Sequence, residues 1–204
     1  MSTVKSRREQ YSQATRAALI EAATRRFAER GFAGTSLEDV AADIQATRGA
    51  VYHHFTSKTA LFEAVFDQLE TGVVERSAAA AARAADPWQG AIAALNVFLD
   101  ECCDPVYGKV VWREAPLALG WHRWRECEER YAYGLISQLI GALMDSGYLE
   151  RQPLATTTSI TFHMLGAAGL ALAEAAEPDK PRVRDEYAAV IGRLMYGLRA
   201  EPRP

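Results

Sequence analysis

The amino-acid sequence predicts an all-α protein of about nine helices. Apolar residues recur with helical spacing along nearly the whole chain of 204 residues. No stretch alternates in the manner of a β-strand, and the chain has no Asn-Gly or Asp-Gly hairpin turn. Hydrophobic residues make up 49% of the chain and charged residues 24%, as in a globular protein with a sizeable core.

Most of the expected helices are marked at their ends. The first has an apolar face and stops at Gly31, and the second and third follow capping residues near Ser36 and Thr47. The fourth continues through alanine-rich sequence of high helix propensity, and Asp86-Pro87 starts the fifth. In chain order we expect helices over 11–30, 37–44, 48–54, 58–84, 87–103, 105–118, 121–146, 153–176 and 181–200.

Charge is distributed unevenly along the chain. Residues 1–60 carry nine Lys and Arg against six Asp and Glu, whereas the remainder is acidic and the whole chain has a net charge of −3. A basic small end on an acidic body suggests that the first sixty residues meet a polyanion. A chance imbalance on solvated faces is the alternative.

Several classes of protein find no support in the sequence. No apolar run approaches the length that spans a bilayer, and the N-terminus lacks the apolar stretch of a signal peptide, so we expect a cytoplasmic protein without a membrane partner. There is no nucleophile elbow, P-loop, dinucleotide fingerprint or zinc-protease motif. We therefore expect no enzyme, no cofactor and no metal.

Residues 37–55 have the spacing of a helix-turn-helix. Apolar residues from Val40 to Ile44 and from Val51 to Phe55 are separated by a turn at Gln45-Ala46. The outward face of the second helix is built from short or hydrogen-bonding residues, which suit the major groove of DNA. These residues are Thr47, Arg48, Gly49, Ala50, Tyr52 and His53.

Four segments together resemble the N-terminal domain of repressors of the tetracycline-repressor (TetR) family. They are Phe27-Ala-Glu-Arg-Gly-Phe32, Thr35-Ser-Leu-Glu-Asp-Val-Ala-Ala42, Arg48-Gly-Ala-Val-Tyr-His-His-Phe55 and Ser57-Lys-Thr-Ala-Leu-Phe62. The resemblance covers about residues 12–66. One departure is Gln45, which stands where many members have glycine in the turn.

The resemblance implies roles for individual residues. Thr35 or Ser36, together with Lys58, would contact phosphates, and Tyr52 would reach the DNA backbone. Arg48, Gly49, Ala50 and His53 would face the bases. It also implies a homodimer on double-stranded operator DNA, with residues 1–57 as the DNA-binding domain, 1–10 as a disordered arm, and 58–204 as the ligand-binding and dimerisation domain.

The C-terminal body concentrates the aromatic residues. All four tryptophans lie between 88 and 124, and such residues with a few polar tips could line a ligand cavity, although a simple aromatic core is the alternative. The candidate ligand-binding residues are Phe98, Cys102, Trp112, Trp121, Trp124, Tyr131, Phe162 and His163.

The last two expected helices predict a dimer interface. The helix over 153–176 is apolar almost all round and the final helix carries a broad apolar stripe, so pairs of them could form a four-helix bundle between two chains. Completion of the core within one chain is the alternative. The candidate interface residues are Ile160, Met164, Ala168, Tyr187, Ile191, Leu194, Met195 and Leu198.

These features favour a ligand-responsive transcriptional regulator. We expect a repressor that binds a palindromic operator as a dimer and is released by a small hydrophobic or aromatic effector. The alternative keeps the helix-turn-helix but senses a metal or oxidant through Cys102, Cys103 and Cys127 with His122.

Overall fold

The computed structural model describes residues 7–199, and its regular structure is helical apart from one isolated bridge between Leu149 and Arg199. The all-α prediction is confirmed. The elements are α1 (Arg7–Arg30), α2 (Leu37–Asp43), α3 (Arg48–His54), α4 (Lys58–Ala82), α5 (Pro87–Cys103), α6 (Pro105–Tyr107), a π-helix η1 (Gly108–Glu114), α7 (Ala115–Leu119), α8 (Trp121–Asp145), α9 (Leu154–Glu174), a 3₁₀ turn η2 (Glu177–Asp179) and α10 (Lys180–Gly197).

The expected N-terminal arm over 1–10 overlaps the first helix. Residues 7–10 belong to α1, which begins at Arg7, so that part of the prediction is wrong. Residues 1–6 of the expected arm lie outside the described residues. A first turn containing Gln10 and Glu9, both good helix formers, extends the helix ahead of the apolar face that sequence reasoning used to place its start.

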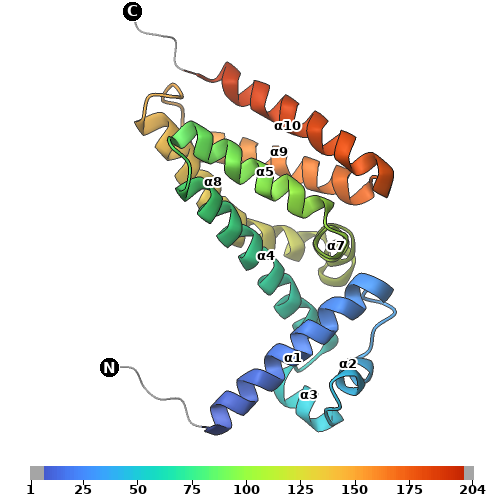
Figure 1. Cartoon of the computed structure of the whole chain (residues 1–204). Helices are drawn as coiled ribbons and strands as arrows, with labels where there is room; N and C mark the ends of the chain where they lie inside the picture. The colour runs from blue at the N-terminus through green and yellow to red at the C-terminus, as the bar shows by residue number, and fades with distance from the viewer. Residues whose placement is uncertain (1–6, 200–204) are drawn as a thin grey trace, which may run out of the picture.

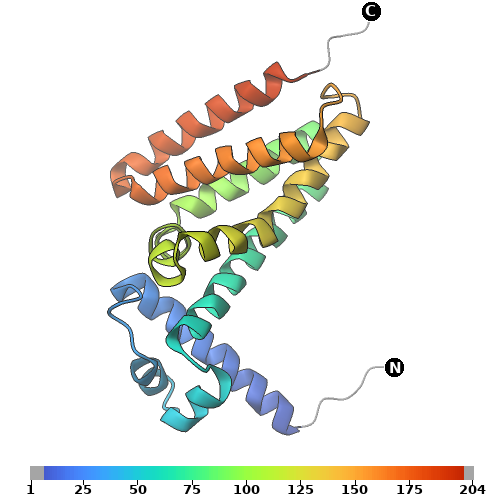
Figure 2. The same ribbon diagram turned by 180° about the vertical axis from the view of Figure 1, so that it is seen from behind.

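One end of the molecule is formed by α1, α2 and α3, as Figures 1 and 2 show. Helix α4 leaves this end and runs into a body of packed helices that includes α5, α8, α9 and α10, and α10 lies at the end remote from α2 and α3. Helix α4 packs along both α1 and α5. A single long helix therefore connects the two ends of the molecule.

Aromatic packing fixes α1 against α4 at the small end. The Phe27 and Phe62 ring centroids lie 4.9 Å apart, and Phe32 meets Phe62 edge-on at 5.4 Å. Phe55, at the end of α3, is also buried. Arg26 on α1 also bonds both carboxylate oxygens of Asp43 at the end of α2, at 2.5 and 2.7 Å.

The expected single helix over 105–118 is wound in three parts. Asp104 caps α6 by accepting from two backbone N–H groups, and seven residues of π-helix follow before α7 begins. At Gly108 an added Cβ would lie 2.8 Å from the carbonyl oxygen of Cys102. Apolar spacing does not distinguish wider winding from an α-helix over so few residues, so the sequence carried no sign of it.

The turn between α2 and α3 is strained at Gln45. This residue has a φ of +54°, the only positive φ at a non-glycine position in the described part of the chain. A side chain raises the energy of this left-handed conformation, whereas glycine adopts it freely. The turn that the motif requires is therefore formed despite the departure from glycine.

Replacing Gln45 with glycine is expected to stabilise the protein by about 1 kcal/mol, because the strain of the left-handed turn is released. Calorimetry should show a melting temperature higher by roughly 2–4 °C. Gln45→Ala is the control, since alanine keeps the strain. Equal melting temperatures for the glycine and alanine variants would contradict this explanation.

Candidate DNA-binding face and ligand pocket

The N-terminal end of α3 is exposed to solvent. Thr47 caps the helix by accepting from the backbone N–H of Ala50 at 3.2 Å. Val51 and Phe55 point into the core. The opposite side of the helix is consequently exposed, and it carries the predicted residues Arg48, Gly49, Tyr52 and His53, with Ala50 half-buried among them.

Arg48 is positioned by neighbours within the same protein. Its side chain is 72% exposed, and its Nε lies 3.1 Å from Glu38 Oε1 on α2. Its guanidinium carbon also lies 5.4 Å from the centroid of the Tyr52 ring. An exposed pair of this kind contributes little to stability. The guanidinium can therefore exchange Glu38 for an anion or a base edge at little cost.

Gly49 has no structural role inside the protein. It is the second residue of α3, its φ is not positive, and an added Cβ would meet only Thr47 Oγ1, at 4.0 Å. Glycine lowers the stability of a helix relative to other residues. A glycine at an exposed helix start with free space around it suits the close approach of another molecule.

The three expected phosphate contacts differ in their placement. Ser36 caps α2 in a capping box with Asp39 and remains partly exposed. Thr35 is buried and donates its hydroxyl to the carbonyl of Gly31 at 2.9 Å, so its side chain holds the loop and we correct its assignment as a phosphate contact. The ammonium of Lys58 donates to the Phe32 carbonyl at 2.7 Å and lies 4.3 Å from the Phe32 ring centroid.

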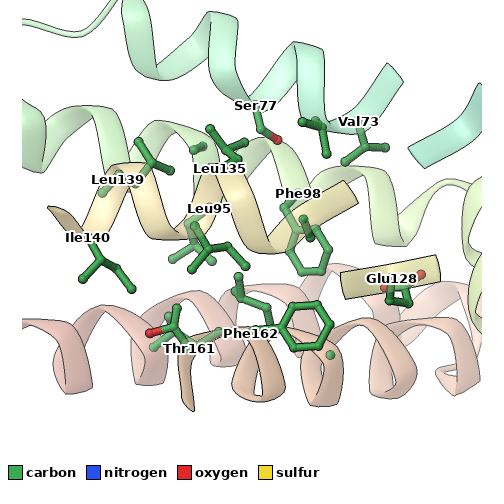
Figure 3. A pocket seen from close by; sticks show the side chains of 18 of the residues that line it. Val73, Ser77, Leu95, Phe98, Glu128, Leu135, Leu139, Ile140, Thr161 and Phe162 are labelled. Carbon is green, nitrogen blue, oxygen red and sulfur yellow. The ribbon is translucent and has the colours of Figure 1, made fainter. Parts of the chain in front are cut away.

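A cavity lies in the body between α4, α5, α8 and α9 (Figure 3). It encloses about 1130 Å³ of atom-free space including its open mouth. Most of its lining is aliphatic or aromatic, from Val73 on α4 through Leu95 and Phe98 on α5 to Leu139 on α8. Such a cavity suits a small apolar ligand.

Half of the predicted ligand-binding residues line this cavity. They are Phe98, Trp112, Trp124 and Phe162. Trp112 is held in place by α9, because a Cβ at Gly169 would lie 2.4 Å from the Trp112 ring. Its indole in turn meets Trp124 edge-on at 5.8 Å between centroids.

The other four predicted ligand-binding residues do not line the cavity. Cys102 is buried in the core one helical turn beyond Phe98 on α5, and Trp121 lies on the surface, 61% exposed. Tyr131 packs toward Phe66 on α4. His163 is exposed on α9, where its Nδ1 donates to the Ser159 carbonyl and its Nε2 accepts from Arg125 at 2.7 Å. Trp121, Tyr131 and His163 are turned away from the cavity by the rotation of their helices, whereas Cys102 lies beyond the end of the cavity lining on α5.

Two buried carboxyl groups in the cavity were missed by sequence reasoning. Glu70 on α4 is 2% exposed and Glu128 on α8 is 4% exposed, and both line the cavity. Tyr107 donates its hydroxyl to Glu70 at 2.6 Å, whereas Glu128 Oε1 has no hydrogen-bond partner in the protein. Helical spacing could have found Glu70, which lies four residues after buried Phe66 and three before buried Val73.

Burial changes the protonation of this pair. Removal from water raises the pKa of Glu70 to about 7, even though the Tyr107 hydrogen bond works in the other direction. Burial also raises the pKa of Glu128 well above its usual range, and the nearby charge of Glu70 raises it further. The carboxyl groups are therefore close enough to influence each other.

Two domain-family models match this chain. The N-terminal domain of bacterial regulatory proteins of the tetR family matches residues 19–65. The tetracyclin repressor-like C-terminal domain matches residues 88–198, more than half of the chain.

The chain belongs to the TetR family.

Solved structures and curated relatives agree with this assignment. A TetR-family regulator from Pectobacterium atrosepticum is 30% identical and has a TM-score of 0.83, over 98% of this chain and 100% of that one. RolR, solved with its ligand resorcinol, shares the fold with a TM-score of 0.69 at 19% identity, over 96% of this chain and 98% of RolR.

The curated relatives match mainly through the DNA-binding end. The regulator TtgR of Pseudomonas putida is 48% identical over 63 residues, which are 31% of this chain and 30% of TtgR. The probable acrEF/envCD operon repressor of Escherichia coli is 33% identical over 130 residues, 62% of this chain and 56% of that protein. The chain thus aligns with about a third to a half of the length of these relatives.

The predicted interface residues of this TetR-family chain fall into three groups. Ile160 on α9 is 65% exposed and Leu194 on α10 is 56% exposed, and Leu198 is also exposed. Ala168 and Ile191, by contrast, are buried in the core of the same chain, so their assignment to an interface is corrected. The remaining three, Met164, Tyr187 and Met195, are partly buried and pack against the core.

The three cysteines of this TetR-family chain give no support to the alternative of a redox or metal sensor. None of the three forms a disulfide; Cys102 and Cys127 are buried and Cys103 is partly buried. Burial raises the pKa of each thiol. A raised pKa lowers the fraction of reactive thiolate. His122 instead lies 3.4 Å from Glu126 on the surface, and the described residues contain no group of three potential metal ligands. None of the described helices is both long and apolar enough to cross a bilayer.

Proposed function

We propose that this protein is a ligand-responsive repressor that binds a palindromic operator as a homodimer. The observation that carries the proposal is the exposed start of α3, with Arg48 beside a glycine that the fold does not need. The proposed operator contact surface consists of the exposed or partly exposed residues Ser36, Thr47, Arg48, Gly49, Ala50, Tyr52, His53 and Lys58. Such a protein acts where the bacterial chromosome lies, in the cytoplasm.

We assign the DNA-binding domain to residues 1–57 and the ligand-binding and dimerisation domain to 58–204. The start of α4 supports this division, because its N-cap Ser57 accepts from Ala60 N at 3.0 Å. In a symmetric dimer the two α3 helices must lie about 34–36 Å apart, or a multiple of that distance, to enter successive major grooves. A change in the angle of α4 alters this spacing.

The cavity is connected to the DNA-binding end through η1 as well as through α4. Trp112 lines the cavity, and two residues later Glu114 accepts from the backbone N–H of Phe32 at 2.7 Å. The Phe32 carbonyl then accepts from Lys58 at the start of α4. On the same segment Lys109 donates to the Glu29 carbonyl at 3.1 Å. A ligand that displaces Trp112 would thereby move the loop that follows α1.

A gel-shift titration on the DNA flanking the protein's own gene tests this function. We expect a dimer to bind a palindromic site there with an affinity at least about 1,000-fold above that for unrelated DNA. A ligand of the cavity should lower the affinity for that site, and the site should lower the affinity for the ligand by the same factor. Binding of all DNA sequences with equal affinity would disprove an operator-specific regulator.

The proposed dimer interface is the exposed apolar face of α9 and α10. Ile160, Leu194 and Leu198 lie on it, together with Val190, which sequence reasoning did not include. Val190, Leu194 and Leu198 are spaced by four residues and so share one side of the helix. Large apolar side chains exposed in this arrangement are typical of an interaction surface.

Leu194→Glu is expected to convert the dimer to a monomer of 22.4 kDa, because a charge would be buried without a partner. Sedimentation equilibrium measures the mass directly. Ala189→Glu is the matched control, since Ala189 is exposed on α10 but turned about 140° from Leu194. Dissociation by both variants, or by neither, would contradict this interface.

A further inference from the structure

We propose that the effector is an organic cation, an apolar or aromatic molecule whose positive charge is held by Glu70 and Glu128. This inference rests on the proposed ligand-binding function of the cavity and specifies its chemistry. It depends on the placement of two acids in an otherwise apolar cavity. Figure 3 labels Glu128, Phe98 and Phe162 among the side chains that line the cavity.

Glu128 is a buried acid that lacks a positively charged partner within the described part of the protein. It is 4% exposed, it lines the cavity, and its Oε1 has no hydrogen-bond partner in the protein. Trp124 lies near enough to lower the pKa of Glu128 slightly, yet its Nε1 also lacks a hydrogen-bond partner of normal geometry. A buried carboxylate without a partner is costly, so a positively charged ligand would bind it favourably.

No side chain in the described residues forms an ion pair with either acid. The charged groups that act on Glu128 are Glu70 on α4 and Arg125 on its own helix. Arg125 is turned toward other partners. It donates to His163 at 2.7 Å, lies 4.0 Å from Glu129, and its guanidinium carbon is 5.0 Å from the Phe162 ring centroid.

The remaining polar groups around Glu70 are neutral. Tyr107 on α6 donates a hydrogen bond to it, and burial raises the pKa of both Tyr107 and Cys102 on α5 well above their usual range. Both groups therefore remain neutral and add no charge to the cavity. With both carboxyl groups ionised, the charged lining consists of two acids and Arg125, so a single ligand cation would neutralise it.

The aromatic lining favours the same class of ligand. Trp112 lies edge-on to Phe98 at 6.2 Å and to Trp124 at 5.8 Å, so the cavity wall beside the acids presents indole and phenyl rings. The face of an aromatic ring attracts a cation, most strongly when water is excluded. The aliphatic remainder of the cavity would receive the apolar part of the molecule.

The test compares three probes that share a phenylbutyl group and differ in the head group. They are (4-phenylbutyl)trimethylammonium, the neutral 4-phenylbutan-1-ol and the anionic 4-phenylbutanesulfonate. Trp112 and Trp124 line the cavity, so quenching of tryptophan fluorescence measures binding. We expect the cation to bind about tenfold or more tighter than the alcohol, and the anion to bind more weakly than the alcohol.

The glutamine variants identify the acids responsible. The double variant E70Q/E128Q should bind cation and alcohol with similar affinity, whereas Glu129→Gln, which removes an exposed acid on the same helix, should keep the preference. For the full-length wild-type protein, affinity for the cation should rise from pH 6 to pH 8, because protons and the cation compete for the carboxylates. The double variant should lose this rise.

The outcomes separate the inference from the proposed function. Equal affinity of the wild-type protein for cation and alcohol, or an unchanged preference in the double variant, would overturn the assignment of a cationic ligand while leaving the cavity as a ligand site. Failure of all three probes to bind would overturn both the assignment and the ligand-binding role of the cavity. Operator binding is measured separately by gel shift, and its result does not depend on the outcome of the probe titrations.

Discussion

Replacing Gly49 with leucine is expected to weaken operator binding about 100-fold or more while leaving the fold intact. A side chain at this position meets open space in the free protein, yet it would project where α3 approaches the floor of the major groove. The two protomers of a dimer would each lose base contacts worth about 1–3 kcal/mol, so the loss is doubled. Gel shift on the operator measures the affinity.

Thermal unfolding measures whether the Gly49→Leu variant keeps its fold. Leucine is a better helix former than glycine, so Gly49→Leu should be as stable as the unmodified protein or more stable, by about 0.5 kcal/mol. Gly134→Leu on α8 is the matched control, because Gly134 is likewise exposed with nothing near its Cβ position. It should leave operator binding unchanged. Full operator affinity in the Gly49 variant would remove α3 from the DNA contact.

Glu70→Gln is expected to raise the free energy of unfolding by about 3 kcal/mol at pH 8 and to change it little at pH 4.5 or below. The pKa of Glu70 is about 7 in the folded protein against an ordinary value of 4.5. The folded state therefore holds a proton that the unfolded state has released between these values, and stability falls as pH rises through this window. Each unit of difference corresponds to about 1.4 kcal/mol.

Urea unfolding at pH 4.5, 6 and 8 measures this difference. The gap between the variant and the unmodified protein should widen with pH and level off above pH 7. Glu129→Gln should show no such trend, since that side chain is exposed. Parallel stability curves for Glu70→Gln and the unmodified protein would show that the Glu70 carboxyl does not carry a raised pKa.

The helices were predictable because their ends are encoded locally. Ser36 caps α2 and forms a capping box with Asp39, Asp86 caps α5 ahead of Pro87, and Gly147 has a positive φ just beyond the end of α8. Each signal depends on neighbours within a few residues. Local chemistry alone is therefore sufficient to place these boundaries within a few residues.

The cavity was only partly predictable because its lining depends on how each helix is rotated in the bundle. Trp121 and Trp124 are three residues apart and their rings touch, yet Trp124 is 1% exposed and Trp121 is 61% exposed. Their residue type made both of them candidates for the ligand pocket, and only the packing of the helices shows which one is buried. Glu70 and Glu128 were missed for the opposite reason, since buried acids are rare and their residue type argued against the interior.

The contact between Trp112 and Gly169 links the sizes of two positions that are far apart in the sequence. Any side chain at 169 would overlap the indole, so a change there can be accepted only together with a smaller residue at 112. Among relatives that keep this helix crossing, we expect the two positions to vary as a pair. Because Trp112 forms part of the cavity wall, each such exchange would also reshape the space available to a ligand. A change of effector specificity during evolution could thus begin on α9, at a residue that the ligand does not touch.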